Sequence, residues 1–97
     1  MKLHYELSKL ALKDIDNIWE YTLDTWSKAQ ANKYYKKIFS AIGTICDNPE
    51  IGKSIEDLKS GHRIAKVKFH LIVYKKKNSN IYIDRILHQR MDVESHI

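Results

Sequence analysis

With 97 residues the chain can form one compact domain with a single hydrophobic core, and we predict one domain over residues 1–97. Hydrophobic residues make up 43% of the chain, with three glycines and one proline, which excludes a disordered or fibrous protein. The net charge of +5 resides in residues 60–97, where eight Lys and Arg outnumber three Asp and Glu, and this favours either an acidic partner or simple solubility.

The first 26 residues predict a short strand followed by a helix. Apolar residues alternate with polar ones over Leu3–Leu7, which is the period of a strand. No signal-peptide core is present there, no apolar run approaches the roughly 20 residues of a membrane span, and Cys46 is the single cysteine, so we expect a cytoplasmic protein. Ser8 is placed to cap a helix with one apolar stripe, formed by Ala11, Ile15, Ile18, Trp19, Thr22 and Trp26. We interpret both tryptophans as core anchors.

A second helix is predicted from about Lys28 to Asp47, with Ser27 as its cap and Asn48-Pro49 as its stop. Its core stripe is Ala31, Tyr35, Ile38, Ile42 and Ile45, flanked by Tyr34 and a buried Cys46. The short break between the helices predicts an antiparallel helix hairpin.

The rest of the chain reads as a loop over residues 48–61 followed by three strands. These cover Arg63–Val67, Phe69–Tyr74 and Asn80–Leu87, with a lysine-rich turn at 75–80. The element order β-α-α-β-β-β predicts an α+β fold, in which the helix hairpin packs on a C-terminal antiparallel sheet. The N-terminal strand has to join that sheet, because a single strand is not stable.

The candidate site residues are cationic. Arg85, His88 and Arg90 fall within six residues, and Arg63 begins an earlier strand. Metal-free RNA cleavage needs a cation to stabilise the phosphorane and a group such as histidine to move a proton, which Arg63, Arg85 and His88 would supply. The same residues are also common at solvated strand ends. The sequence shows neither metal-ligand spacing nor a phosphate-binding glycine loop, so we expect no metal and no cofactor.

Three stretches carry a resemblance to a known family. They are "YELSKLALKDIDNIWEYTLDTWSKAQANKYY", "NPEIGKSIEDLKSGHRIAKVKFHLIVYK" and, most specifically, "IDRILHQRMD". In order and spacing over residues 3–97 the chain is similar to the ParE toxins of the ParE/RelE superfamily. The resemblance implies the toxin half of a bacterial type II toxin–antitoxin module that arrests growth. It also implies a cognate antitoxin with a ribbon-helix-helix domain and a tail that folds on the toxin.

The resemblance leaves three functions open. ParE-like toxins inhibit DNA gyrase without catalysis, and the long helix hairpin with its tryptophans favours this function. In that case Arg63, Arg85 and Arg90 are expected to bind acidic residues of the antitoxin tail. RelE-like relatives cleave mRNA on the ribosome, and Arg63, Arg85 and His88 would then be catalytic. The third possibility is an inactive toxin that still binds its antitoxin.

Overall fold

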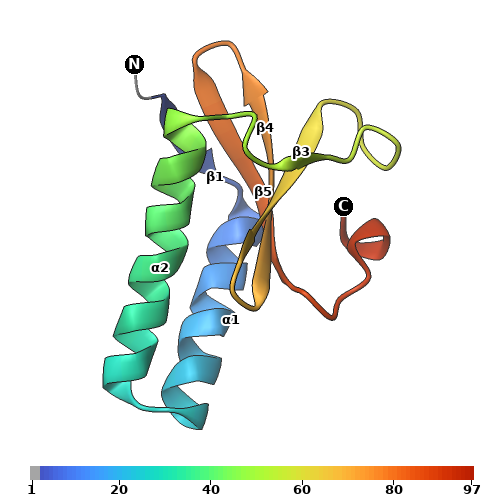
Figure 1. Cartoon of the computed structure of the whole chain (residues 1–97). Coiled ribbons are helices and arrows are strands. Elements are labelled where there is room, and N and C mark those ends of the chain that lie inside the picture. The colour runs from blue at the N-terminus through green and yellow to red at the C-terminus, as the bar shows by residue number, and fades with distance from the viewer. Residues whose placement is uncertain (1–2) are drawn as a thin grey trace.

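The computed structural model describes residues 3–97, which form two helices and a five-stranded sheet (Figure 1). The helix hairpin lies beside the sheet, and the helices are joined at the end where the β3–β4 turn also lies (Figure 1). The elements in chain order are β1 (His4–Leu7), α1 (Lys9–Thr25), α2 (Lys28–Asp47), β2 (Lys53–Ser54), β3 (His62–Val67), β4 (His70–Lys77), β5 (Asn80–His88) and a 3-10 turn, η1 (Val93–His96). The predicted α+β fold is therefore confirmed.

The sheet has the strand order β1-β5-β4-β3-β2. The three C-terminal strands are antiparallel, as predicted. The N-terminal strand lies parallel to β5, with Tyr5 opposite Ile81, so the sheet is mixed. Two short elements were not expected. The loop predicted at 48–61 contains the two-residue β2, and the chain ends in η1, because neither segment is long enough to show a period.

Both helix starts are capped as the sequence predicts. The Ser8 hydroxyl accepts from the backbone N–H of Ala11 at 2.9 Å, and the Ser27 hydroxyl accepts from that of Gln30 at 3.1 Å. The second helix ends at Asp47, one residue before Asn48-Pro49. These caps fix the lengths of both helices and the position of the short turn between them.

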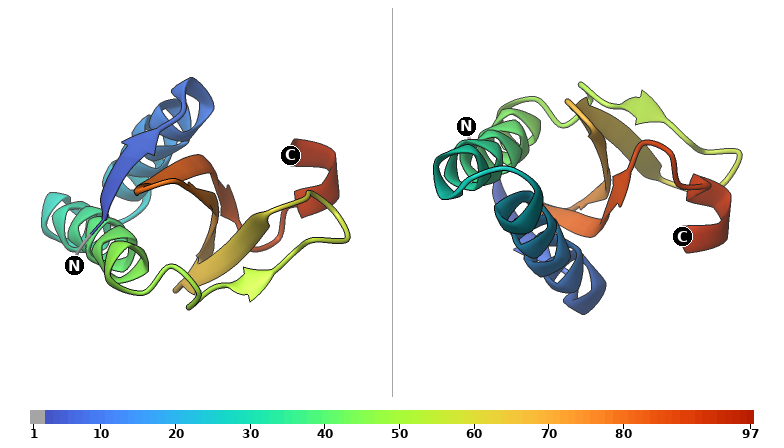
Figure 2. Two further views of the ribbon diagram at one scale, coloured as in Figure 1. Left: turned by 90° about the horizontal axis from the view of Figure 1, so that it is seen from above. Right: turned by 90° about the horizontal axis from the view of Figure 1, so that it is seen from below.

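Each face of the sheet carries its own apolar cluster. The larger one lies between the sheet and the helices and includes Cys46, which is buried as predicted. On the opposite face Ile55, Val73 and Leu87 pack with residues of the C-terminal segment, including Val93. Seen along the helices, the hairpin covers one side of the sheet while the C-terminal segment lies on the other (Figure 2).

Two aromatic predictions are wrong. Trp26 is 45% exposed rather than a core anchor, because it follows the last residue of α1, where the hairpin extends past the sheet. Tyr34 is buried at 5% exposure, whereas Tyr35 is 42% exposed. Adjacent positions on a helix differ by about 100° and both can border an apolar stripe, so the period does not choose between them. Trp19 is partly buried.

Candidate functional site

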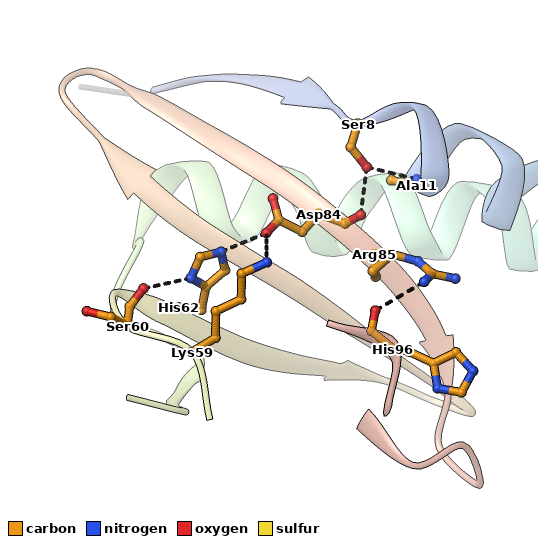
Figure 3. A network of polar contacts seen from close by, with 8 residues as sticks. All are labelled: Ser8, Ala11, Lys59, Ser60, His62, Asp84, Arg85 and His96. Carbon is orange, nitrogen blue, oxygen red and sulfur yellow. Dashed lines mark hydrogen bonds and ion pairs between the residues drawn. The ribbon is translucent and has the colours of Figure 1, made fainter. Parts of the chain in front are cut away.

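Arg85 binds a carboxylate of its own chain. Its Nε and one terminal nitrogen each donate to the Asp14 carboxylate at 2.9 Å, and its other terminal nitrogen donates to the His96 carbonyl at 3.1 Å. Figure 3 shows the guanidinium directed at the C-terminal segment. The Asp14 hydrogen bonds raise the pKa of Arg85, and the two side chains are only 16% and 13% exposed. Arg85 thus joins α1, β5 and the C-terminus.

Asp84, the preceding residue, is the centre of a second network (Figure 3). Its carboxylate accepts from Lys59 at 3.3 Å and contacts Nε2 of the buried His62 at 2.7 Å. The other ring nitrogen of His62 faces the Ser60 carbonyl at 2.8 Å, so both nitrogens need a proton if both hydrogen bonds are to form. Ser8 donates to the Asp84 carbonyl at 2.6 Å. The sequence gives no sign of this network beyond the residue types.

Arg63 is also held within the chain. Its guanidinium donates to the carbonyls of Gly52 and Glu50, at 2.7 and 3.4 Å. The buried Tyr74 hydroxyl supports the same loop, since it donates to the Pro49 carbonyl and accepts from the Gly52 N–H. Burial raises the pKa of Tyr74, so its hydroxyl stays protonated and can donate. Arg63 therefore stabilises the loop before β2.

Arg90 differs from the other two arginines. It is exposed, and within residues 3–97 its guanidinium makes no hydrogen bond or ion pair. Its backbone N–H donates to Nδ1 of His88 at 3.1 Å. Of the three arginines predicted to bind a partner, Arg90 alone has a side chain free to do so without breaking an internal contact.

His88 packs against a second, buried histidine. The rings of His70 and His88 meet edge to face at 5.2 Å, and Nδ1 of His70 lies 2.5 Å from the Tyr34 hydroxyl. Burial, together with the nearby His88, lowers the pKa of His70 to about 4. His70 is therefore neutral at physiological pH, and its Nδ1 is hydrogen-bonded to the Tyr34 hydroxyl.

The three residues considered for RNA cleavage do not converge. Arg63 lies opposite Tyr74 and His88 lies opposite His70. Because Tyr74 and His70 are four residues apart on β4, Arg63 and His88 are separated by about 13 Å along the strand direction. Arg63 and Arg85 are also bound to separate groups, the 50–52 loop and Asp14. A single phosphodiester needs its acid, base and cation within hydrogen-bond reach.

A surface that the sequence analysis missed lies between the two helices. Trp19 and Tyr35 meet edge to face at 5.8 Å, and Tyr35 packs on Phe39 at 4.8 Å. Leu12 and Leu23 lie seven residues before and four residues after Trp19, on the same side of α1, and are 50% and 39% exposed. We call these five residues the hairpin groove. The only sign of this surface in the sequence is that the two helices carry more apolar residues than one core-facing stripe on each requires.

Neither a metal site nor a membrane span is found in the part of the chain that the structure describes. No three His, Cys, Asp or Glu side chains within residues 3–97 form a group that could hold a metal ion. Neither helix combines the length and the apolar character needed to cross a bilayer.

Comparison with known proteins identifies the family. The model of the ParE toxin of type II toxin–antitoxin systems (parDE) matches residues 5–93. Toxin ParE1 of Mycobacterium tuberculosis is 33% identical over 98 residues, covering all of both chains, and Toxin ParE1 of Caulobacter vibrioides is 32% identical over 93 residues, covering 96% of each. A solved structure of the chromosomal ParDE system from P. aeruginosa has a TM-score of 0.77 at 17% identity and covers 90% of this chain and 96% of its own. The chain therefore belongs to the ParE toxin family of type II toxin–antitoxin systems.

Proposed function

We propose that this ParE-family toxin inhibits DNA gyrase without catalysis, arrests growth from within the cytoplasm, and is neutralised by a cognate antitoxin. Its family membership supports a toxin with an antitoxin partner. Two observations support a non-catalytic mode of action. Arg63, Arg85 and His88 lie apart, and both arginines are held in contacts that stabilise the fold.

The hairpin groove is the observation that best supports an antitoxin site. Three aromatic and two leucine side chains form a stripe across α1 and α2, in which Leu12, Leu23 and Tyr35 are exposed and the other two are partly buried. Exposed apolar stripes of this kind bind the apolar face of an amphipathic helix. We assign this groove to a helix from the antitoxin tail.

A second part of the tail can pair with the sheet. The short β2 pairs only with Ile64 and Arg63, so the remainder of β3, Ala65–Val67, presents an edge toward a shallow groove of about 260 Å³ beside Ile45 and Ile51. An extended segment added there would continue the sheet. Acidic residues of the same tail would meet Arg90, whose guanidinium is exposed.

The target is tested with purified gyrase. The folded protein should inhibit supercoiling of relaxed plasmid or leave gyrase-dependent breaks, and adding the antitoxin should restore supercoiling. Unimpaired gyrase in the presence of excess folded toxin would contradict this target. Cleavage of mRNA on programmed ribosomes would instead establish the nuclease activity.

Two leucines on one helix provide a matched test of the hairpin groove. Leu12 and Leu10 are 50% and 55% exposed, but only Leu12 lies on the side of α1 that carries Trp19. Leu12→Ala should weaken antitoxin binding by about 1–2 kcal/mol through lost apolar contact, whereas Leu10→Ala should leave it unchanged. Equal effects of the two substitutions would exclude the groove as the antitoxin site.

A further inference from the structure

Three aromatic rings form a platform where the helix hairpin meets the β3–β4 turn. Trp26, Tyr34 and Phe69 lie with centroids 6.1 to 6.3 Å apart. Trp26 and Phe69 are 45% and 36% exposed, and Tyr34 is buried between them and the core. The Tyr34 hydroxyl is held by the Val67 carbonyl and His70, and accepts from the Phe69 N–H. The two exposed rings thus rest on a fixed base, which we call the tip platform.

The tip platform separates two grooves that both lack carboxylates. The larger has a volume of about 770 Å³, lies beside α2, and is lined by Lys33, Lys37 and Lys68 as well as the rings. The smaller, about 260 Å³, lies between the end of α1 and the end of β5 and includes Arg90. Four cationic side chains therefore surround the exposed rings, and no acidic side chain from residues 3–97 lines either groove.

The turn that carries Phe69 has an unusual residue. Lys68 has φ of +51°, in the left-handed region that glycine and asparagine favour. The other hairpin turn satisfies the same requirement with Asn78, at φ of +57°. A lysine at such a position is strained, and strain of this kind concentrates where a side chain has a function. The Lys68 ammonium lies 5.7 Å from the centre of the Phe69 ring, so charge and ring are presented together.

The chemistry of this surface fits a flexible polyanion that carries flat rings. Nucleic-acid bases stack on exposed aromatic side chains while the backbone phosphates pair with lysines, and this arrangement is typical of sites for single strands. The amides of Gln30 and Gln89 lie in the two grooves, where they can reach base edges. A purely acidic peptide would use the lysines but would leave the rings without a partner.

We propose that the tip platform binds a single strand of nucleic acid, with bases stacked on Trp26 and Phe69 and phosphates held by Lys33, Lys37 and Lys68. Stacking and point charges do not read the 2′-hydroxyl, so DNA and RNA strands are bound alike. The site lies on a different side of α2 from the hairpin groove, and the proposal does not depend on gyrase being the target.

The test is fluorescence anisotropy of the full chain with labelled oligo-dT and oligo-rU. Trp26→Ala and Phe69→Ala should each weaken binding by roughly 5- to 100-fold, the usual effect of losing one stacked base. Lys33→Gln with Lys68→Gln should weaken binding and lower the slope against log salt by about 0.7 for each lysine. Circular dichroism checks that each variant is folded.

The matched control removes two lysines at the opposite end of the sheet. Lys76→Gln with Lys77→Gln changes the net charge by the same amount but lies at the end of β4, next to the turn into β5, so oligonucleotide affinity should stay within about twofold of the parent after correction for overall charge. Equal weakening by the two double variants would show attraction by net charge alone and overturn the proposal.

Lys68→Gly separates binding from folding. Glycine accepts the positive φ without strain, so this variant should melt at a higher temperature than the parent while binding oligo-dT more weakly. Unchanged affinity in this variant would remove Lys68 from the site. Absence of oligonucleotide binding by the folded parent would overturn the proposal. Displacement of the oligonucleotide by polyglutamate at equal charge concentration would also overturn it, in favour of an acidic protein partner.

Discussion

The ion pair between Asp14 and Arg85 should contribute strongly to stability, although Arg85 was predicted from the sequence to bind a partner. Asp14→Ala removes three hydrogen bonds at 2.9 Å, two from the guanidinium and one from the Ile86 N–H. The Arg85 charge would remain in a setting where its side chain is only 16% exposed. We therefore expect Asp14→Ala to lower the free energy of unfolding.

The size of the effect follows from burial. Breaking a fully buried ion pair costs about 3–5 kcal/mol, and the residual exposure of this pair reduces the expected value to about 2–3 kcal/mol. For a domain of this length that corresponds to a fall in Tm of roughly 10–20 °C. Arg85→Ala should have a similar effect, because the Asp14 carboxylate then keeps only the backbone N–H of Ile86.

Urea unfolding followed by circular dichroism measures both variants and the double variant. The double variant should be more stable than the sum of the single losses predicts, by about 1–3 kcal/mol, since the pair is lost only once. Asp16→Ala, at an exposed position on the same helix, is the control and should change stability by less than about 0.5 kcal/mol. Additive effects of the two single substitutions would refute the reasoning.

Three further predictions concern the buried polar groups. Burial lowers the pKa of His70 to about 4, so as the pH falls the imidazole is protonated first in the unfolded chain, where its pKa is near 6.5. The free energy of unfolding should therefore fall by up to about 3 kcal/mol between pH 6.5 and 4. His70→Gln should flatten that part of the plot of stability against pH. Tyr34→Phe should cost about 1–3 kcal/mol in thermal unfolding, because its buried hydroxyl is hydrogen-bonded to the Val67 carbonyl, His70 and the Phe69 N–H, while Tyr35→Phe on the exposed side should be neutral. Gly52→Ala should lower the free energy of unfolding by about 1–3 kcal/mol, since a Cβ there would lie 2.6 Å from the Tyr74 hydroxyl. The loss caused by Gly52→Ala should be smaller in a Tyr74→Phe background, and full additivity of the two substitutions would contradict this contact.

The fold could be predicted from the sequence because most of its signals are local. Ser8 and Ser27 cap helices through neighbours three residues away, and Pro49 ends the second helix by a local steric effect. Apolar periods placed the buried faces of both helices. They could not separate Tyr34 from Tyr35, because the choice depends on the Val67 carbonyl and His70, which arrive from a distant hairpin.

The candidate site was less predictable for the same reason. The sequence indicated the arginines, but not that Arg85 pairs with a residue 71 positions away or that Arg63 binds loop carbonyls. Charge patterns show how many cations a segment carries, whereas the partners of each cation depend on tertiary structure. Arg90 keeps the predicted role open because it lies past the last strand, where no group within residues 3–97 forms a hydrogen bond or ion pair with its guanidinium.

The parallel pairing of β1 with β5 has a consequence for how the protein is made. Tyr5 leaves the ribosome early, but its partner Ile81 lies 76 residues further along the chain and emerges much later. The helix hairpin can form from local contacts during synthesis, whereas the sheet closes only after β5 has emerged. A truncated nascent chain lacks both this pairing and the anchor from Arg85 to Asp14. The helix hairpin can thus form before the strand that holds β1 and Asp14 in place has been made.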